Sequence, residues 1–217
     1  MPFRDREDAG HRLAERLTGL ELHRPVVLAL PRGGVPVAAP VAAALGAPLD
    51  VFVARKVGAP GHPEFGIGAI AEGSDEVVSS ADAARVGVSP KQMDSLAAAQ
   101  REELERRVRR YRGDRELPEL DDRDVVLIDD GLATGVTAEA ALRSLRRLGA
   151  RRLVLAIPVC APDSAERLMS VADTVLCLEC PPNFAAVGYW YENFDQTTDD
   201  EVLALLDRGR SGRGSAP

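Results

Sequence analysis

The sequence predicts an α/β protein with a twisted parallel sheet flanked by helices and a small C-terminal hood. Short apolar runs alternate with helical segments and are joined by short loops, which is typical of a parallel sheet covered on both faces. At 217 residues, 45% of them hydrophobic, the chain suits one globular domain with a substantial core. The net charge of −7 argues against a general nucleic-acid binder, because such proteins neutralise phosphates with an excess of Lys and Arg.

The first part of the chain predicts an opening helix and then a strand–turn–helix unit. Leucines at helical spacing over residues 5–20, with charges elsewhere, indicate an amphipathic helix. The apolar run 25–30 predicts a strand, residues 31–34 a glycine turn, and the Ala-rich segment 36–45 a helix with Pro in its first turn. We expect further strands at residues 49–53, 67–71 and 76–80, the last two forming a hairpin or a meander.

The second part of the chain predicts a long helix followed by a regular alternation of strands and helices. Ser89 is placed to cap a charged helix that runs to about Tyr111. Strands are expected at residues 124–128, 152–157 and 174–178, and helices at residues 138–148, 163–171 and 199–206. We therefore predict a single domain over residues 1–208, with a core at 22–180, a hood from 1–21 and 181–208, and a disordered tail at 209–217.

The strongest chemical signal is the segment VVLIDDGLATGVT, residues 125–137. A buried strand ends in Asp129 and Asp130, and a turn of small residues then leads into a helix. Backbone N–H groups at a helix start favour phosphate, and Thr134 and Thr137 add hydroxyl donors. Ionised carboxylates accept hydrogen bonds from sugar hydroxyls, so the pattern suits a ribose 5-phosphate. Neither a Gly-Lys-Ser/Thr nor a Gly-x-Gly-x-x-Gly motif is present, which argues against a nucleotide P-loop and a dinucleotide site.

Residues 129–137, DDGLATGVT, resemble the phosphoribosyl-pyrophosphate (PRPP) signature of type I phosphoribosyltransferases. The resemblance covers residues 25–180 and is close to an uncharacterised bacterial stand-alone branch. It implies that fold and a Mg²⁺-dependent transfer of the 5-phosphoribosyl group from PRPP to a nitrogen of a nucleobase-like acceptor. It assigns Asp129 and Asp130 to catalysis and to the metal, directly or through water. The residues it assigns to the phosphate and ribose are Gly131, Leu132, Ala133, Thr134, Gly135, Val136 and Thr137.

Two further segments resemble parts of the same family that handle pyrophosphate. Arg32, Gly33 and Gly34 stand where the family's pyrophosphate loop lies, a loop that often holds a strained peptide bond; a plain turn is the alternative. Arg55 and Lys56 resemble the basic start of the mobile loop that closes over PRPP in adenine and orotate phosphoribosyltransferases. Those relatives carry a further basic residue near the position of Ala59, so charge for the leaving pyrophosphate is weaker here or comes from elsewhere.

The acceptor side of the predicted site is less defined. Glu64, in the segment Glu-Phe-Gly, resembles an acid that lies near the base in the adenine branch, although an exposed loop carboxylate would look the same. Ala133 replaces the acid that faces the purine in the 6-oxopurine branch, which argues against hypoxanthine or guanine. Five of the nine aromatic residues lie within residues 184–194. We expect Phe184, Tyr189, Trp190 and Tyr191 to stack on the base, unless the hood merely packs its own small core.

The remaining features limit where we expect the protein to be located and which partners we expect it to bind. No apolar run is long enough for a membrane span and the charged start does not resemble a signal peptide, so we expect a cytoplasmic protein. Cys177 and Cys180 form a lone CxxC that we interpret as buried thiols at a strand end, with no disulfide framework. Expected partners are PRPP, a small heterocyclic acceptor and a second copy in a homodimer, without nucleic acid or membrane. The alternatives are a non-catalytic PRPP or nucleotide sensor and, more weakly, a phosphatase that uses Asp129.

Overall fold

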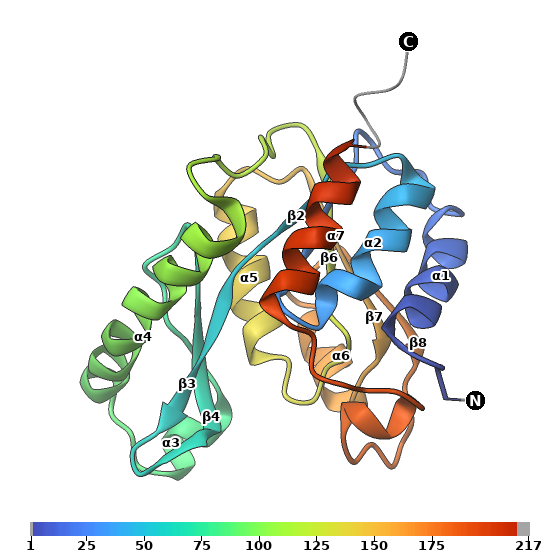
Figure 1. The fold of residues 1–217 in the computed structure, drawn as a ribbon. Helices are drawn as coiled ribbons and strands as arrows, with labels where there is room; N and C mark the ends of the chain where they lie inside the picture. The colour runs from blue at the N-terminus through green and yellow to red at the C-terminus, as the bar shows by residue number, and fades with distance from the viewer. Residues whose placement is uncertain (1, 212–217) are drawn as a thin grey trace.

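The computed structural model describes residues 2–211 and is built on a five-stranded parallel sheet (Figure 1). The strands, in spatial order, are β2 (Leu49–Val51), β1 (Val26–Ala29), β6 (Asp124–Ile128), β7 (Arg152–Val159) and β8 (Thr174–Glu179). All four neighbouring pairs are parallel. The predicted fold class is therefore confirmed for the described residues.

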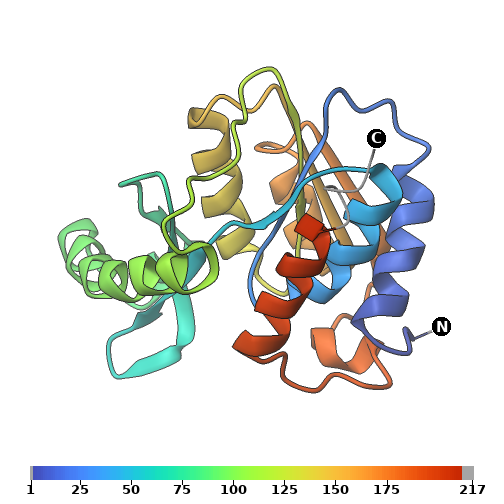
Figure 2. The same cartoon turned by 45° about the horizontal axis from the view of Figure 1, so that its top comes forward.

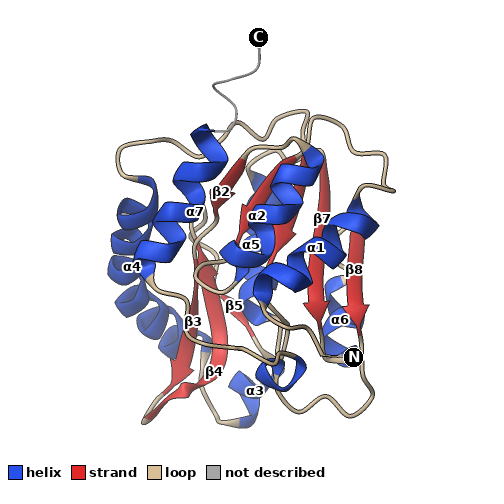
Figure 3. Ribbon diagram, turned by 45° about the vertical axis from the view of Figure 1, so that its right-hand side comes forward, coloured by secondary structure: helices blue, strands red, loops and turns tan. Residues whose placement is uncertain are grey.

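Helices cover both faces of this sheet (Figure 3). One face carries α1 (Arg6–Leu17), α2 (Gly34–Leu45) and α7 (Asp199–Ser211), and the other carries α5 (Val136–Arg147) and α6 (Pro162–Leu168). Successive strand residues point to opposite faces, so Val27 packs with the α1–α2 core while Leu28 packs with the α5 core. Because both faces are covered, β1 is apolar throughout and β6 is apolar after Asp124, as expected for a parallel sheet.

Residues 54–112, which we call the arm, project from one side of the main body (Figures 1 and 2). They form an antiparallel sheet of β3 (Ala54–Ala59), β4 (His62–Ala71) and β5 (Val78–Ser79), followed by α3 (Ala81–Arg85) and α4 (Pro90–Arg112). The predicted hairpin of β4 and β5 is confirmed, and Ser89 and Gln92 form a reciprocal cap at the start of α4.

The resemblance implies a mobile loop that begins at Arg55 and Lys56, and the Gly and Pro residues of the segment 56–66 also suggest a loop. The structure corrects this expectation. Lys56 lies on β3, opposite Ala69 of β4, and the two strands are joined by a tight turn in which Gly61 has a φ of 76°. Register shifts on either side of Gly58 mark an irregularity that glycine accommodates. The Gly and Pro residues that suggested a loop therefore lie in a turn and a bulge of the antiparallel ribbon formed by β3 and β4.

A buried ion-pair network fastens the end of α4 to the main body. Arg112, 5% exposed, donates from Nη1 to Glu72 Oε2 at 2.6 Å and from Nη2 to the Val51 carbonyl at 2.8 Å. The Glu72 carboxylate also accepts from the Val53 N–H at 2.6 Å, and Asp50 lies 3.8 Å from Arg112 Nε. These contacts join α4 and β4 to the end of β2.

Replacing Arg112 with Leu is expected to lower the free energy of unfolding by about 3–5 kcal/mol, because it leaves the buried Glu72 carboxylate without its cation. Urea denaturation followed by circular dichroism measures the change. The control is Arg109→Ala on the same helix, since Arg109 is exposed and pairs only with exposed Glu105 among the contacts described. A loss in Arg112→Leu no larger than that of the control would contradict the role given to the network.

The hood and the C-terminus complete the main body. The segment around the 3₁₀ turn η1 (Val187–Trp190) pairs with the N-terminus, where the Phe3 N–H donates to the Trp190 carbonyl at 2.7 Å. Helix α7 continues to Ser211, so residues 209–211 are helical and not the start of a disordered tail; the rest of that predicted tail lies outside the described residues. No helix in the described part of the chain is long and apolar enough to cross a membrane.

The cysteines also differ from the prediction. A disulfide joins Cys160, which directly follows β7, to Cys177 within β8, and Cys180 is free and exposed. The interpretation of the CxxC as two buried thiols is therefore wrong. The 17-residue separation of the bonded pair carries no local signal, and only the parallel pairing of the two strands brings these side chains together.

Candidate active site

The candidate site lies where β1 and β6 end. Ala29 and Ile128 are opposite each other in the sheet, so the loops that follow leave it side by side. One loop holds Gly33 and Gly34, and the other begins with Asp129 and Asp130. This is the sheet edge at which open α/β folds bind ligands. The structure thus brings together the two loops that the sequence assigned to pyrophosphate and to ribose phosphate.

Close packing between these loops explains their glycines. A Cβ on Gly33 would overlap the Asp130 carboxylate, and a Cβ on Gly34 would lie 2.7 Å from the Ile128 carbonyl oxygen. A Cβ on Gly131 would lie 2.5 Å from Val187 of the hood. Each contact is shorter than a real Cβ makes, so a side chain at any of these three positions would force its neighbour to shift. The Pro31–Arg32 peptide bond in the first loop is cis.

The 131–137 turn directs its backbone donors to one side. The carbonyl of Leu132 accepts from the Ala161 N–H at 2.9 Å, that of Ala133 accepts from Ser164 Oγ at 2.6 Å, and that of Thr134 accepts from Arg167. In a trans peptide the next N–H points away from the carbonyl. The N–H groups that follow these carbonyls belong to Ala133, Thr134 and Gly135. They therefore point away from β7 and α6, and they lie at the N-terminus of α5. Such a turn can bind an anion such as phosphate.

The acid pair is held in a poorly hydrated position. Asp129 Oδ1 accepts from the Asp130 N–H at 2.9 Å. Burial, reinforced by the neighbouring Asp130 carboxylate, raises the pKa of Asp129 well above its usual range. Burial also raises the pKa of Asp130, and the charge of Arg6 acts in the opposite direction. A ligand that brings hydroxyl donors or a cation would relieve this cost, which makes the pair suited to a sugar diol or a hydrated metal ion.

Comparison with known proteins agrees with this geometry. Residues 4–193 match the family model described as a phosphoribosyl transferase domain. The chain belongs to that family. It is 48% identical over 206 residues, 95% of its length, to a protein of Mycobacterium tuberculosis H37Rv that carries the name "putative phosphoribosyl transferase". The match spans only 46% of that relative, so the chain covers about half the length of the curated proteins it resembles.

Two solved structures share the fold of this chain. The protein TT1426 of Thermus thermophilus is 49% identical, with a TM-score of 0.80 over 95% of this chain and 98% of that one. A protein of Aquifex aeolicus, AQ2163, shares the fold at a TM-score of 0.50 and 14% identity, over 81% of this chain and 74% of that one. None of the three names states an acceptor for the transferred group.

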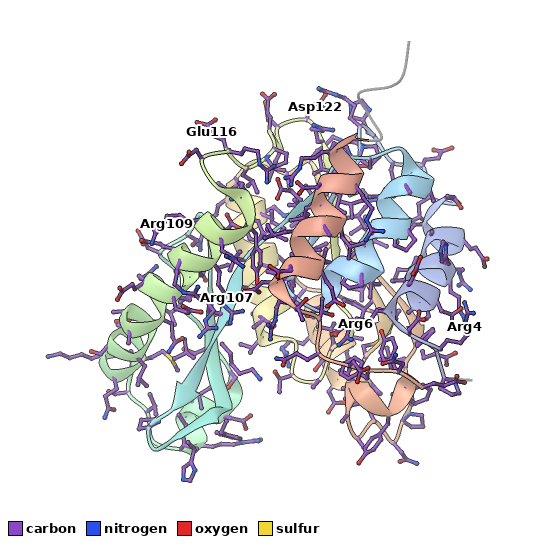
Figure 4. All side chains as sticks on the ribbon, viewed as in Figure 1. Arg4, Arg6, Arg107, Arg109, Glu116 and Asp122 are labelled. Atoms are coloured by element: carbon purple, nitrogen blue, oxygen red, sulfur yellow. A yellow bond between two sulfur atoms is a disulfide. The ribbon has the colours of Figure 1, made fainter. Side chains whose placement is uncertain are left out.

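Arg6 is a site residue of this phosphoribosyl transferase domain that sequence reasoning missed. Its Nε donates to Asp130 Oδ2 at 2.8 Å, its Nη1 donates to the Asp195 carbonyl at 2.7 Å, and its guanidinium lies 3.9 Å from the centre of the Phe194 ring. Figure 4 shows it at the start of α1, beside the hood. Since 124 residues separate Arg6 from Asp130, nothing in the sequence distinguished it from the other charges of the opening helix.

The hood aromatics divide into buried and exposed rings. Tyr191 is 6% exposed and lies 5.4 Å from the ring of Phe3 and 5.0 Å from that of Phe194, while its hydroxyl donates to the Asp130 carbonyl at 2.6 Å. Its assignment to base stacking is therefore corrected: the ring belongs to a small core that supports the acid loop. Phe184 and Trp190 pack partly against the same core, whereas Tyr189 is 78% exposed.

The two basic residues of β3, Arg55 and Lys56, point in different directions. Arg55 turns toward α4, where its Nη2 donates to Gln100 Oε1 at 2.9 Å, and the exposed Lys56 packs its stem beside Gly66. Adjacent strand residues point to opposite faces, so these two cations do not act from one direction. Arg32 Nη1 lies 3.9 Å from Asp199 Oδ1 of α7. Glu64 lies on β4, and its side chain is outside what the structure describes.

Proposed function

We propose that the protein transfers the 5-phosphoribosyl group of PRPP to a nitrogen of a nucleobase-like acceptor and releases pyrophosphate. The observation that carries this proposal is the adjacency of three parts at one sheet edge: the acid pair Asp129–Asp130, the 131–137 turn, and the loop of Gly33 and Gly34. Membership of the phosphoribosyl transferase family supports it. For the acceptor we propose only a chemical class, a nucleobase-like compound with a reactive nitrogen.

Each part has a distinct role in the proposed reaction. The N–H groups of the 131–137 turn, with the hydroxyls of Thr134 and Thr137, would bind the 5-phosphate. Asp129 and Asp130 would accept hydrogen bonds from the ribose hydroxyls and place negative charge near the cationic ring of the transition state. Arg32 and the glycines beside it would bind pyrophosphate. The protein then acts chiefly by positioning its two substrates and by stabilising charge.

The donor set at the acid pair suits Mg²⁺ bound together with PRPP. No cluster of three or more acidic, His or Cys side chains that could hold a metal occurs among the described residues. Two adjacent carboxylates fit an ion that keeps several waters and takes its other ligands from substrate oxygens, as Mg²⁺ does. Asp129 and Asp130 would hold it, directly or through water, and the ion would neutralise charge on the departing pyrophosphate.

The test is an acceptor screen. PRPP is incubated with single purines, pyrimidines and azoles, with Mg²⁺ or with EDTA, and pyrophosphate release and nucleotide formation are measured by coupled assay and mass spectrometry. We expect pyrophosphate release that depends on both Mg²⁺ and one acceptor, with 6-oxopurines inactive because Ala133 replaces an acid. Loss of PRPP that yields only ribose 5-phosphate in every reaction would contradict the proposal.

A non-catalytic PRPP or nucleotide sensor is the second candidate, favoured by two observations. Arg6 already pairs with Asp130 at 2.8 Å, and the position of Ala59 on β3 supplies no cation. A sensor would bind PRPP in calorimetry yet show no turnover with any acceptor. Four further points stay predictions. They are the position of Glu64 beside the base, a base-binding face that includes Phe184, Tyr189 or Trp190, a homodimer, and a cytoplasmic location.

A further inference from the structure

A cavity of about 840 Å³ lies on the side of the sheet that carries α1, α2 and α7. Helix α2 lies between α1 and α7 (Figures 1 and 3), and all three helices contribute residues to the lining. The hood segment 193–197 borders the cavity where α1 begins, and the Asp195 carbonyl there accepts from Arg6 Nη1 at 2.7 Å. Pockets of this volume are typical of small-molecule sites.

The α2 side of the cavity is apolar and made of short side chains. Its residues recur every three or four positions, as expected for one face of a helix and its end: Pro36, Ala39, Ala43 and Ala47. Leu205 of α7 adds a half-buried apolar side chain to the lining. Since short side chains fill little space, α1 and α7 stand on either side of a hollow. This surface offers contact to an apolar group but no side-chain hydrogen bond.

Four carboxylates line the end of the cavity nearest to Asp130. They come from the start of α1, from the hood and from the first turn of α7: Asp5, Glu7, Asp195 and Glu201. Hydrogen bonds from the Thr198 N–H and hydroxyl lower the pKa of Glu201, so it is ionised at neutral pH. No hydrogen bond to the Asp195 carboxylate occurs among the described residues. This end of the cavity, which we call the acidic end, therefore offers charged acceptors.

The arginines of the lining leave most of this negative charge in place. Arg6 Nε pairs with Asp130 Oδ2 at 2.8 Å, so a carboxylate outside the cavity balances its charge. Arg208 follows Glu201 on α7 by seven residues, which places it about 10 Å further along the helix. A cation is therefore favoured at the acidic end.

We propose that this cavity binds a small organic cation, a primary amine with an extended apolar body. The ammonium group would donate to carboxylates of the acidic end, chiefly Asp195 and Glu201, and the apolar body would lie along α2. Arg6 separates this site from the acid pair, because its guanidinium contacts both the hood and Asp130. The inference goes beyond the proposed function and does not depend on it.

The test is calorimetric titration of the full chain with octylamine and with two matched compounds. Octanoate has an apolar body of similar length and the opposite charge, and ethylamine has the charge without the long body. We expect octylamine to bind about 10-fold more tightly than octanoate, because the acidic end repels a carboxylate. We expect it to bind about 100-fold more tightly than ethylamine, because each buried methylene adds affinity. Octanoate that binds as tightly as octylamine would overturn the cationic class of the ligand.

Two tryptophan variants locate the site. Ala43→Trp places an indole in the cavity and should weaken octylamine binding by about 10-fold or more, because the ring takes the place of the apolar body. Ala44→Trp is the matched control, since Ala44 is also exposed but lies outside the lining. Both variants should melt within about 2 °C of the unchanged protein, as exposed substitutions usually do. Equal octylamine affinities in the two variants would show that the cavity is not the site.

A second pair of variants tests the charge. Asp195→Asn should weaken octylamine binding by about 5-fold, as expected for the loss of one charge-assisted hydrogen bond. Glu192→Gln, an exposed change in the same part of the hood but outside the lining, should bind octylamine like the unchanged protein. Equal affinities in these two variants would overturn the position given to the ammonium group.

A parallel titration with PRPP separates this inference from the proposed function. A protein that binds PRPP but no octylamine would overturn the amine site alone. A protein that binds octylamine but no PRPP would overturn the proposed function alone.

Discussion

Replacing both Asp129 and Asp130 with Asn is expected to abolish turnover and to weaken PRPP binding by about 100-fold or more. The two acids directly follow β6, and both are half-buried beside the turn that suits a phosphate. Each carboxylate would provide charged acceptors for ribose hydroxyls, and such hydrogen bonds are about twice as strong as neutral ones. Calorimetry with PRPP and the pyrophosphate-release assay measure the two effects.

In the single variant Asp129→Asn, stability should not fall together with activity. A carboxyl whose pKa is raised in the folded protein stabilises the fold at acidic pH and loses that contribution as pH rises through the folded pKa. Burial raises the pKa of Asp129, so Asp129→Asn should melt no lower than the unchanged protein at neutral pH. Asp122→Asn, an exposed change outside the site, is the control for activity. Unchanged PRPP affinity in the double variant would contradict the site assignment.

Replacing Gly33 with Ala is expected to lower kcat/KM by about 100-fold, because misplacing catalytic groups by even 1 Å costs that much. A methyl group at this position overlaps the Asp130 carboxylate, which the bond from Arg6 holds in place. Either the β1 loop or the acid must then shift. The steady-state pyrophosphate-release assay gives kcat/KM, and thermal melting reports whether the fold survives.

Gly19→Ala is the matched control for that change. Gly19 has a negative φ, and a methyl group there meets only the Arg16 carbonyl oxygen at 3.5 Å, an ordinary contact. We expect this variant to keep full activity and to gain a little stability from the lower entropy of its unfolded chain. If Gly33→Ala were as active as Gly19→Ala, the close fit between the two loops would have no part in catalysis.

The local elements were predictable because their signals lie close together in the chain. One continuous segment, residues 124–147, contains a strand, the acid pair, a turn of small residues and a helix. Backbone hydrogen bonding within this segment fixes the order in which these elements follow one another. Every predicted strand and helix is present among the described residues, although the bounds differ by a few residues and β3, α3 and η1 were not expected. The boundaries moved because caps such as Gly135, with a φ of 67°, decide where a helix begins.

The sequence by itself therefore determined the fold class, the acid pair and the glycine loop, because each depends on neighbouring residues. Only the tertiary structure decided which distant side chains complete the site. Arg6 reaches Asp130 across 124 residues, and Tyr191 reaches the same residue across 61. The hydroxyl of Tyr111 on α4 reaches Asp199 on α7 across 88 residues. The physical reason is that burial and charge pairing depend on which elements pack together, and a solvent-exposed arginine and a buried one look alike in a sequence.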